Sequence, residues 1–585
     1  MNHWKRNLYL KKYGSYSNMQ TFVSDFETTK TIPARVWAWG ICSLERPDLF
    51  LYGTGIDSFM ELCREENRLI YFHNERFDGQ FILHYLLTEL KFTYNEKRLS
   101  KTFNVLINEH GQFFQIEVIF KRRGRNLERV IFQDSYKKLP FSVANIAKAF
   151  KLPLQKGSID HDKERPEGYE PDDKEIAYLR NDCQIVAQAL KIQYDEGLSR
   201  MTIGADALNI YKDMIGQKEF KTLFPPLVLD VDSSIRASYR GGYTYLMPQY
   251  AEQDLPEGIV LDRNSMYPTV MKNELMPYGV PVFFVGKYIP NDTYPLYTQT
   301  LFAEFTLKPG HVPTVQIKDS IRFLETEYVT DTGVNPVEIT LTSVDLDLLF
   351  EHYDVYVHEW IGGWQFKAAH GLFDQYIDYW TEIKEANAKE KNALYVLAKL
   401  MLNNLYGKFG QKLIVKGKYP EIENDIVVYK NLEQKEKDGV YIPIASFITA
   451  YARRDIICEI QKVYSRFIYA DTDSLHLIGT HLPEDIDLHP SRLGAWDVEK
   501  QYIRARYLHA KCYVQEMWVR KKVGRFWLNG KRAKITCAGM PENVKKKVSF
   551  ARFTVGLTEF GKLVPKNVPG GTHLVETYFT IRKTG

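Results

Sequence analysis

The stretch RFIYADTDSLHLIG (466–479) places apolar residues on both sides of a short polar turn, which predicts a strand, a turn and a second strand. Asp471 and Asp473 are two residues apart at the tip, and side chains at this spacing point to the same side of an extended chain. Two such carboxylates repel each other, and a bound divalent cation would relieve the repulsion. Alone, the four residues DTDS are also typical of an ordinary polar turn.

A third acidic residue follows another apolar run. Asp262 comes directly after GIVL (258–261), so we expect it at the end of a separate strand. Acids at the ends of separate strands can converge on two metal ions, one activating an attacking 3′ hydroxyl and the other steadying a leaving pyrophosphate. By itself, Asp262 is more typical of a strand-terminal cap.

The stretch LAKLMLNNLYGKFG (397–410) has the apolar spacing of an amphipathic helix. Lys399, Asn403 and Tyr406 are spaced i, i+4 and i+7, so they share one helical face. Gly407 predicts the end of this helix, because glycine is common just past a helix C-terminus. A cation, an amide and an aromatic ring on one face suit a nucleoside triphosphate, whereas a helix with one wet face gives no reason for an aromatic residue there.

A second acidic set lies nearer the N-terminus. Asp25 and Glu27 are two residues apart on a predicted strand, and Asp78 lies at the start of a predicted helix. Tyr178 and Asp182 are four residues apart on another predicted helix. Four acids from three elements, with a tyrosine nearby, suit two metal ions and a water oriented for phosphodiester hydrolysis. Helix caps and surface acids are the plainer interpretation.

Composition bounds the class of protein. At about 100–200 residues per domain, 585 residues predict three to five folding units. The 44% hydrophobic and 26% charged residues exclude wholesale disorder, while the net charge of +4 says little about partners. Six cysteines without a CxxC pair favour reduced thiols in a cytosolic protein over a zinc site or disulfide framework. No apolar run reaches the about 18 residues of a membrane span.

Basic residues concentrate late in the chain. The segment from Lys500 to Arg552 contains 15 Lys and Arg residues against 2 Glu, with aromatic residues between them. Its strand-like apolar spacing predicts that the cations line one face, which is the electrostatic footprint of a polyanion site. HExxH, P-loop and dinucleotide-binding motifs are absent, so zinc hydrolase, P-loop ATPase and NAD enzyme functions are unsupported.

In order and content, these motifs resemble those of family B DNA polymerases, specifically the protein-primed enzymes of phi-twenty-nine-type bacteriophages. The resemblance covers almost the whole chain after the first twenty residues. It implies an α/β and α+β multidomain fold with a ribonuclease H-like 3′–5′ exonuclease domain and a right-hand polymerase domain of palm, fingers and thumb. The implied boundaries are 1–20 for a basic N-terminal extension, 21–203 for the exonuclease domain, 204–273 for the first part of the palm, 274–375 for insertion 1, 376–410 for the fingers, 411–436 for insertion 2, 437–540 for the second part of the palm, and 541–585 for the thumb.

The resemblance implies three exonuclease motifs at DFET (25–28), NERFD (74–78) and YLRND (178–182). The catalytic residues implied there are Asp25, Glu27, Asp78, Tyr178 and Asp182, with Lys156 in support. Thr28, Asn74, Phe77 and Ser135 match positions that hold the single-stranded primer end in this family. The family usually has leucine after that serine, whereas this chain has Tyr136.

The polymerase motifs carry the remaining implied roles. YRGG (239–242) resembles the linker motif that couples the two activities, and Tyr267 resembles the residue under the incoming sugar, where its ring leaves no room for a 2′ hydroxyl. TAYAR (449–453) and KCY (511–513) resemble primer-terminus contacts. The implied nucleotide-binding residues are Tyr267, Lys384, Lys399, Asn403 and Tyr406. The implied DNA-binding residues are Thr28, Asn74, Phe77, Ser135, Tyr136, Tyr239, Gly241, Gly242, Ser265, Gly407, Thr449, Arg453, Lys511 and Tyr513.

The implied cofactor is Mg²⁺, replaceable by Mn²⁺, with two ions per active site. The implied metal ligands are Asp262, Arg263, Asp471 and Asp473 for synthesis, and Asp25, Glu27, Asp78 and Asp182 for trimming. The implied partners are primer-template DNA, deoxynucleoside triphosphates, a terminal protein that serves as primer within a heterodimer, and a single-stranded DNA-binding protein. The implied location is the cytoplasm of a bacterial host.

The two insertions have implied roles of their own. Insertion 1 is where the family contacts terminal protein and duplex. Within insertion 2, QKLIVKGKY (411–419) and NDIVVYK (424–430) are expected to pair as a hairpin closing around the template. Such closure would explain strand displacement and processivity without a clamp.

The sequence therefore predicts a DNA-directed DNA polymerase that replicates a linear phage-type genome by protein-primed, processive, strand-displacing synthesis. It also predicts 3′–5′ proofreading, a two-metal mechanism at both sites and extension of DNA primers. Three alternatives stay open: an RNA- or DNA-primed polymerase that ignores terminal protein, a catalytically decayed DNA-binding homologue, and an exonuclease without synthesis.

Overall fold

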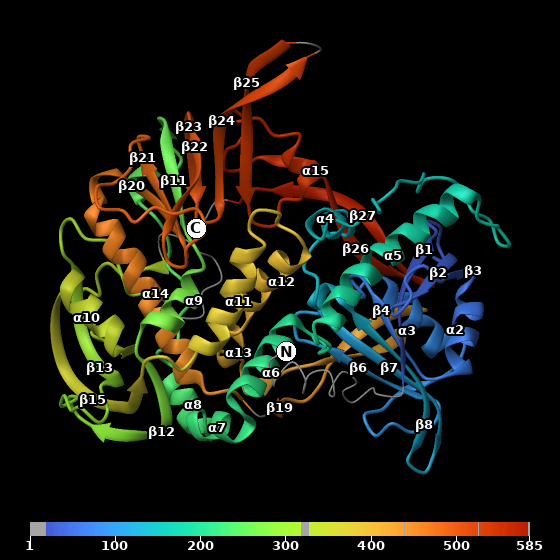
Figure 1. Cartoon of the computed structure of the whole chain (residues 1–585), viewed down its shortest axis with the longest axis horizontal. Helices are drawn as coiled ribbons and strands as arrows, with labels where there is room; N and C mark the ends of the chain where they lie inside the picture. Colours follow the sequence, from blue (N-terminus) through green and yellow to red (C-terminus); the bar gives the residue numbers. More distant parts are fainter. Residues whose placement is uncertain (1–18, 318–326, 438, 524–525, 583–585) are drawn as a thin grey trace.

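The computed structural model describes residues 19–317, 327–437, 439–523 and 526–582. Figure 1 shows an N-terminal unit in blue and teal beside a green and yellow unit, with orange and red strands above them. The predicted basic extension (1–20) lies outside the described residues, apart from its last two. None of the helices in these ranges combines the length and the apolar composition that a membrane span requires.

The N-terminal unit is built on one eight-stranded sheet, in the order β3-β2-β1-β4-β8-β7-β6-β5. Helix α5 packs on β1 and β2, while α2 and α3 share a core with the other face. Because helices cover both faces, every residue of the central strand β4 is buried. The strands are β1 (Gln20–Thr28), β2 (Val36–Ser43), β3 (Phe50–Gly53), β4 (Arg68–Phe72), β5 (Thr93–Tyr94), β6 (Thr102–Ile107), β7 (Phe113–Arg123) and β8 (Asn126–Asp134). The helices are α2 (Ile56–Glu65), α3 (Asp78–Thr88), η1 (Ser135–Lys137), α4 (Val143–Ala149) and α5 (Asp173–Asp195).

The second unit is centred on a five-stranded antiparallel sheet, in the order β22-β11-β21-β20-β9. The strand–turn–strand predicted for 466–479 is confirmed, because β20 and β21 pair across a tight turn. Its strands are β9 (Thr244–Leu246), β11 (Gly258–Arg263), β20 (Phe467–Asp471), β21 (Ser474–Ile478) and β22 (Trp496–Tyr502). A neighbouring sheet contains β10 (Asp254–Leu255), β23 (Arg504–His509), β24 (Cys512–Val523) and β25 (Phe526–Cys537). The helices around them are α6 (Ile203–Ile215), α7 (Gln217–Leu223), α8 (Leu229–Arg236), η2 (Pro248–Tyr250), α9 (Met266–Asn273), α14 (Ile442–Lys462), η4 (Tyr464–Arg466) and α15 (Glu542–Lys545).

Insertion 1 (274–375) contains a four-stranded sheet in the order β12-β15-β13-β14. It carries one helix, α10, between β14 and β15. The bounds are β12 (Met276–Val285), β13 (Leu296–Leu307), β14 (Val337–Thr342), α10 (Ser343–His352) and β15 (Tyr353–Ala369).

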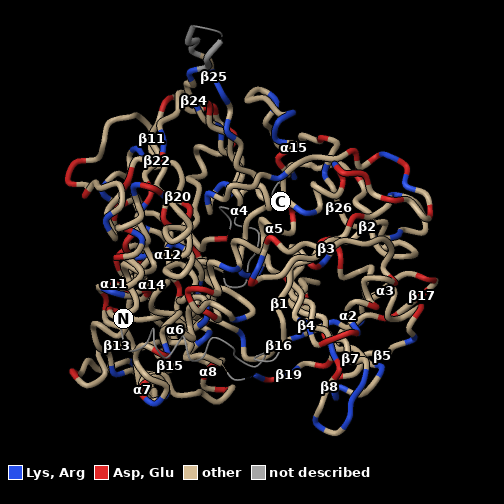
Figure 2. Tube along the Cα trace, turned by 45° about the vertical axis from the view of Figure 1, so that its right-hand side comes forward, with Lys and Arg blue, Asp and Glu red and all other residues tan. Residues whose placement is uncertain are grey.

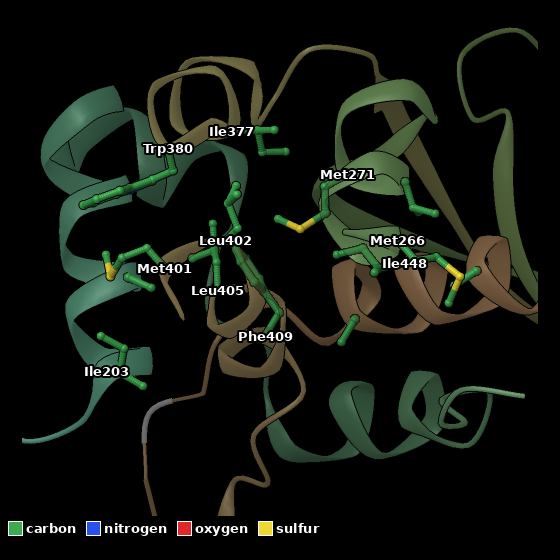
Figure 3. Close-up of a cluster of buried hydrophobic side chains, with 14 of the residues drawn as sticks. Ile203, Met266, Met271, Ile377, Trp380, Met401, Leu402, Leu405, Phe409 and Ile448 are labelled. Atoms are coloured by element: carbon green, nitrogen blue, oxygen red, sulfur yellow. The ribbon is translucent and has the colours of Figure 1, made fainter. Parts of the chain in front are cut away.

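Three helices occupy the range suggested as fingers (376–410): α11 (Asp374–Ala386), α12 (Ala393–Asn404) and α13 (Tyr406–Phe409). Figure 3 shows Met401, Leu402 and Leu405 packed into one cluster with residues of neighbouring elements. The prediction that Gly407 ends the helix is wrong, because α12 already ends at Asn404 and Gly407 lies inside α13. Leu405, between the two helices, keeps helical backbone angles. The chain therefore continues as α13, which ends at Phe409, and the Phe409 side chain is buried.

Two long hairpins reach back to the N-terminal unit. A hairpin forms within 411–436 as predicted, but β17 (Lys418–Glu423) is the strand that pairs with β18 (Ile426–Asn431). Of the predicted strand 411–419, only Lys418 and Tyr419 take part in this pairing. A shorter pair, β16 (Ile414–Val415) and β19 (Lys435–Glu436), forms its base. The C-terminal hairpin joins β26 (Thr558–Val568) to β27 (Gly571–Thr580). The β17–β18 and β26–β27 hairpins both contact α3.

The Lys and Arg residues of the basic segment (500–552) are not arranged as the sequence predicted. Figure 2 shows Lys and Arg positions along the β24–β25 hairpin and around α15. Lys531 lies opposite Trp518 and shares its side of the hairpin, whereas Arg532 and Lys534 project to the other side. The prediction that the cations line one face is therefore wrong, because the strand register distributes them over both.

Candidate active sites

The three acids predicted for synthesis gather at one end of the five-stranded sheet. Asp262 lies opposite Ser474 in the pairing of β11 with β21, and Asp471 lies opposite the same Ser474 in the pairing of β20 with β21. The backbone N–H of Arg263 donates to the carbonyl of Asp473 at 2.8 Å. Neighbouring strand ends thus bring together carboxylates that are more than 200 residues apart in the chain.

These carboxylates lie in an environment that disfavours their ionised forms. The pKa of Asp262 is raised to about 7, first by burial and then by Asp473 and Glu499, against the lowering effect of the Lys399 cation. Burial also raises the pKa of Asp473. Because ionisation of these carboxyl groups is unfavourable, additional positive charge at the site would stabilise their ionised forms.

Two acids of this site were missed in the sequence. Asp497 lies opposite Asp262 in the pairing of β11 with β22, and Glu499 follows two residues later on the same strand. The charge of each raises the pKa of Asp262. The alternating pattern in AWDVEK (495–500) was the available signal, since it places both acids on one face of a strand.

Asp471 differs from the other two acids because it has a cation partner. Nζ of Lys511 lies 2.6 Å from its Oδ1, and the Thr244 hydroxyl donates to the same oxygen at 3.3 Å. Lys511 has a left-handed φ of 56°, and its backbone N–H donates to the Tyr469 hydroxyl. Asp471 therefore holds Lys511 beside the site, which leaves Asp262 and Asp473 as the acids in greatest need of a cation.

The predicted nucleotide-binding face borders these acids. Lys399 and Asn403 are exposed on α12, and the Tyr406 ring packs on the Tyr267 ring with centroids 4.1 Å apart. Nζ of Lys384 donates to the Ser265 hydroxyl at 3.0 Å. The pKa of Lys384 is lowered, first by burial and then by the Lys399 cation, so two cations act on one another at this face.

The YRGG linker passes directly over this face. A Cβ on Gly242 would lie 3.0 Å from the Tyr267 hydroxyl and 2.8 Å from a methyl of Thr472, so only glycine fits there. Gly241 and Gly407 instead face open space, where a Cβ would meet nothing within 4 Å. Tyr239 packs its hydroxyl close to Gly410, beside the end of α13.

The direct primer contacts predicted for Thr449 and Arg453 are wrong. Both side chains are only 1% exposed. The Arg453 guanidinium donates to both carboxylate oxygens of Asp345 and to the carbonyls of Arg240 and Gly241. Arg453 therefore joins the YRGG linker to Asp345 of insertion 1 inside the protein, and its side chain does not reach the surface.

One further predicted contact needs correction. The Arg263 guanidinium donates to Asp455 at 2.6 Å and has no acceptor atom, so its side chain cannot bind a metal and only its main-chain carbonyl is a possible ligand. Tyr513 packs against Tyr469 and Tyr507 beside the synthetic site, and the primer contact suggested for it stays a prediction.

The second acidic set converges as predicted. Asp25 and Glu27 lie on β1, Asp78 is the first residue of α3, and Asp182 lies on α5. The pKa of Asp25 is raised to about 7 by burial and then by Asp182, against Lys156. The pKa of Asp78 is raised by burial and then by Asp25. Each acid thus acts on another of the set, although they come from three elements.

Lys156 joins this second site. It forms an ion pair with Asp182, and its Nζ lies 5.1 Å from the centroid of the Tyr178 ring. Tyr178 is one turn before Asp182 on α5. The lysine, the tyrosine and the acid therefore form one contiguous group.

Both acidic sets offer oxygen donors of the kind that hard divalent cations prefer. No three His, Cys, Asp or Glu side chains within the described ranges are grouped closely enough to hold a metal ion as they stand. However, one carboxylate oxygen of Asp78 and one of Asp182 are buried without a hydrogen-bond partner. Unsatisfied buried oxygens and raised carboxyl pKa values are what a cation would relieve, so the residues fit Mg²⁺.

The predicted single-strand contacts divide into exposed and buried groups. Asn74 and Tyr136 are exposed, and Thr28 and Phe77 are partly so. Ser135 is fully buried, where it donates to the Phe72 carbonyl at 3.1 Å and bonds with His73 Nδ1 at 2.9 Å. The direct strand contact predicted for Ser135 is therefore wrong.

Comparison with known proteins places this architecture. A family profile described as DNA polymerase type B, organellar and viral, matches residues 60–170 and 158–489. The DNA polymerase of Bacillus phage Nf is 43% identical over 571 residues, covering 96% of this chain and 99% of that protein. This chain belongs to the type B DNA polymerases. It is thus a DNA polymerase of the phi29 type, as the motifs predicted.

Further relatives support the same assignment. The DNA polymerase of Bacillus phage phi29 is 42% identical over 569 residues, covering 95% of this chain and 98% of that protein. The solved structure of phi29 DNA polymerase with primer-template DNA matches with a TM-score of 0.91 and 41% identity, covering 96% of this chain and all of that one. The predicted multidomain α/β and α+β fold is confirmed by this match.

Proposed function

We propose that this polymerase extends the 3′ end of a DNA primer along a template and consumes deoxynucleoside triphosphates. The observation that carries the proposal is the meeting of two acids with raised pKa values, Asp262 and Asp473, with the cations of Lys384 and Lys399. Solved complexes of phi29 DNA polymerase with primer-template DNA and incoming nucleotides support the same substrates.

We propose that each acidic set binds two divalent cations, Mg²⁺ or Mn²⁺. Asp262 and Asp473 would hold them for synthesis, with the main-chain carbonyl of Arg263 as a further donor, and the four acids around Asp25 would hold them for trimming. When bound, such ions supply the Lewis acidity that activates the attacking oxygen and stabilises the leaving group.

The chain's own side chains have distinct tasks during synthesis. Lys384 and Lys399 neutralise the triphosphate and orient it toward the acids. The Tyr267 ring, held by its packing on Tyr406, lies beneath the sugar and excludes a 2′ hydroxyl. Lys511, held by Asp471, meets the phosphate at the primer end.

We also propose that the second site proofreads by removing nucleotides in the 3′–5′ direction. Lys156 supports Asp182 through their ion pair, and Tyr178 beside them orients the attacking water. Asn74, exposed with a left-handed φ of 68°, and the partly exposed Phe77 flank the site and would hold a frayed single strand.

Protein priming is the next part of the proposal. Insertion 1 exposes large apolar side chains, with Val280 72%, Val285 82% and Ile289 80% exposed. Exposed apolar groups gathered on one insertion are typical of an interaction surface. We propose that a terminal protein covers this surface in a heterodimer and presents its hydroxyl as the primer.

The two hairpins support strand displacement and processivity. The β17–β18 hairpin and the β26–β27 hairpin both rest on α3, so DNA enclosed between them and the polymerase sheets cannot leave sideways. A single-stranded DNA-binding protein would receive the displaced strand, in the cytoplasm of a bacterial host.

Rolling-circle synthesis tests this function. With a DNA primer on a nicked circle, Mg²⁺ and all four deoxynucleoside triphosphates, we expect products longer than the circle. Deleting 411–436 should stop synthesis at the nick while filling of a short gap continues, and unchanged displacement would contradict the role of the hairpin. Addition of a candidate terminal protein with labelled nucleotide should yield a labelled protein, which an enzyme primed only by nucleic acid would not produce.

A further inference from the structure

Two cysteines face each other where β24 and β25 join the sheet. The Sγ atoms of Cys512 and Cys537 are 3.3 Å apart, and the residues are directly opposed in the strand register. Both are free thiols. No other pair of cysteine sulfur atoms in the described part of the chain has a hydrogen bond of this kind.

The backbone geometry at this pair suits a disulfide. The N–H of Ala538 donates to the carbonyl of Lys511 at 3.0 Å, which makes Cys512 and Cys537 a non-hydrogen-bonded pair of the antiparallel ladder. Opposed Cα atoms at such positions are about 4.5 Å apart. Disulfides span Cα separations of about 4.4–6.8 Å, so the strands need little movement to accept one.

The two thiols are unequal. The hydrogen bond from Cys512 lowers the pKa of Cys537, and the Lys545 cation lowers it further. The same hydrogen bond and burial raise the pKa of Cys512. Cys512 is fully buried, whereas Cys537 is 8% exposed. Cys537 is thus the thiol that a small oxidant meets first, and Cys512 is the neighbour that resolves it.

The pair adjoins the synthetic site and is separate from the trimming site. Cys512 directly follows Lys511, whose side chain bonds to Asp471. The Lys511 carbonyl is also fixed by Ala538, the residue after Cys537. Any change in the separation of the two strands here therefore acts on Lys511.

We propose that Cys512 and Cys537 are a redox-sensitive thiol pair: hydrogen peroxide links them as a disulfide, which slows synthesis and leaves trimming of single strands unchanged. The Cys537 thiolate attacks peroxide, breaking the O–O bond to give a sulfenic acid and hydroxide. The Cys512 thiol then attacks that sulfur, forming the S–S bond and releasing water. Two thiols lose two electrons in total and one peroxide gains them, and dithiothreitol reverses the change by thiol–disulfide exchange.

The first test maps thiols on the full chain and needs no activity. After peroxide treatment and blocking of free thiols, we expect a peptide containing Cys512 linked to one containing Cys537, lost again on reduction. Cys458→Ser is the matched control, because Cys458 is an exposed cysteine without a facing thiol, and it should leave the linked peptide unchanged. Absence of the linked peptide would overturn the proposal.

The second test measures function and rests on the proposed synthesis. Treated wild-type enzyme should extend a primer several-fold more slowly than untreated enzyme, with full recovery on reduction, and should degrade a single strand at the untreated rate. Cys512→Ala and Cys537→Ala should both resist the treatment. An equal loss of extension rate in these variants after treatment would contradict the regulatory role, and so would an unchanged extension rate of the linked enzyme. Failure of the untreated enzyme to extend a primer would contradict the proposed function instead.

Discussion

The Oδ1 atom of Asp425 lies 3.0 Å from Nε2 of His84, although 341 residues separate the two along the chain. One turn earlier on α3, Oε1 of Gln80 accepts hydrogen bonds from the Tyr429 hydroxyl at 2.7 Å and from the Asn567 amide at 3.1 Å. A single helix face of the N-terminal unit therefore joins the tips of both hairpins. The proposed processivity depends on this junction, because it joins both hairpins to the N-terminal unit.

Gln80→Leu tests that junction. The change removes the shared acceptor, which leaves the Tyr429 hydroxyl without this partner and the Asn567 amide with only its bond to the Val427 carbonyl, at a cost of about 1–3 kcal/mol. We expect shorter products when a trap captures dissociated enzyme, with an unchanged rate of nucleotide addition before dissociation. Gln112→Leu, at an exposed glutamine of the β6–β7 turn, is the matched control and should match wild type. Equal product lengths for Gln80→Leu and wild type would contradict the role of the junction.

Lys399→Ala tests the nucleotide-binding face. A hydrogen bond to a charged group contributes about 1.5–3 kcal/mol, so loss of the cation should raise KM for each nucleotide about 10–100-fold. We expect kcat to fall less, because the acids remain in place. Steady-state primer extension measures both constants.

Lys391→Ala is the control for that measurement. Lys391 is an exposed lysine in the turn before α12, so its loss tests whether general positive charge on the fingers matters. It should leave KM near the wild-type value. A rise equal to that of Lys399→Ala would show that Lys399 makes no specific phosphate contact.

Asp345→Ala tests the buried support of the linker. Removing one member of a buried ion pair leaves an uncompensated charge, at a cost of about 3–5 kcal/mol. We expect the free energy of unfolding, measured with denaturant, to fall by this amount. The reason is that Arg453 is 1% exposed, so solvent cannot replace the carboxylate. Exposed ion pairs contribute less than about 1 kcal/mol to stability. A loss of only this size would mean that water solvates the Asp345–Arg453 pair in solution.

The sequence predicted the parts of both sites that depend on local spacing. Tyr178 and Asp182 at i and i+4 share one side of α5 because that spacing fixes the side of a helix on which a residue projects. Asp471 ends β20 as expected, whereas Asp473 lies in the turn before β21, where Thr472 has a left-handed φ of 63°. The presence of a hairpin within 411–436 was predictable, but its first strand lies at 418–423 and not at 411–419.

Predictions that required knowledge of tertiary burial failed. Thr449 and Arg453 occupy a polar stripe of α14 that other elements cover, and the sequence of the helix alone does not reveal that cover. Glu499 was not identified from the sequence because its strand, β22, is distant from Asp262 along the chain and lies beside it only through pairing with β11. The distribution of Lys531 and Arg532 over two faces likewise follows from a register that the charge count does not contain.

The stability of the metal-free protein should depend on Asp262. Its folded pKa of about 7 lies above the ordinary value of 3.8, so the folded chain binds this proton more tightly than the unfolded chain. Stability from this group is therefore complete below about pH 4 and is lost as pH rises through 7. We expect Asp262→Asn to stabilise the protein by about 1–2 kcal/mol at pH 8, after allowance for solvent screening, and by less at pH 5.

Thermal unfolding in the presence of a chelator measures this difference. Asp485→Asn is the control, because Asp485 is exposed in a loop with a φ of 60° that Asn also tolerates. It should not change stability at either pH. A destabilised Asp262→Asn at pH 8 would mean that this carboxylate is already compensated within the folded chain.

The central claim is that two separate acidic sites perform two separate reactions, and one labelled primer-template tests it in a single assay. With nucleotides, Asp25→Asn should extend the primer at the wild-type rate, and without them it should leave a single strand intact. Asp262→Asn should do the reverse, trimming at the wild-type rate without extending. Loss of both activities in both variants, each folded by circular dichroism, would contradict the existence of two independent sites.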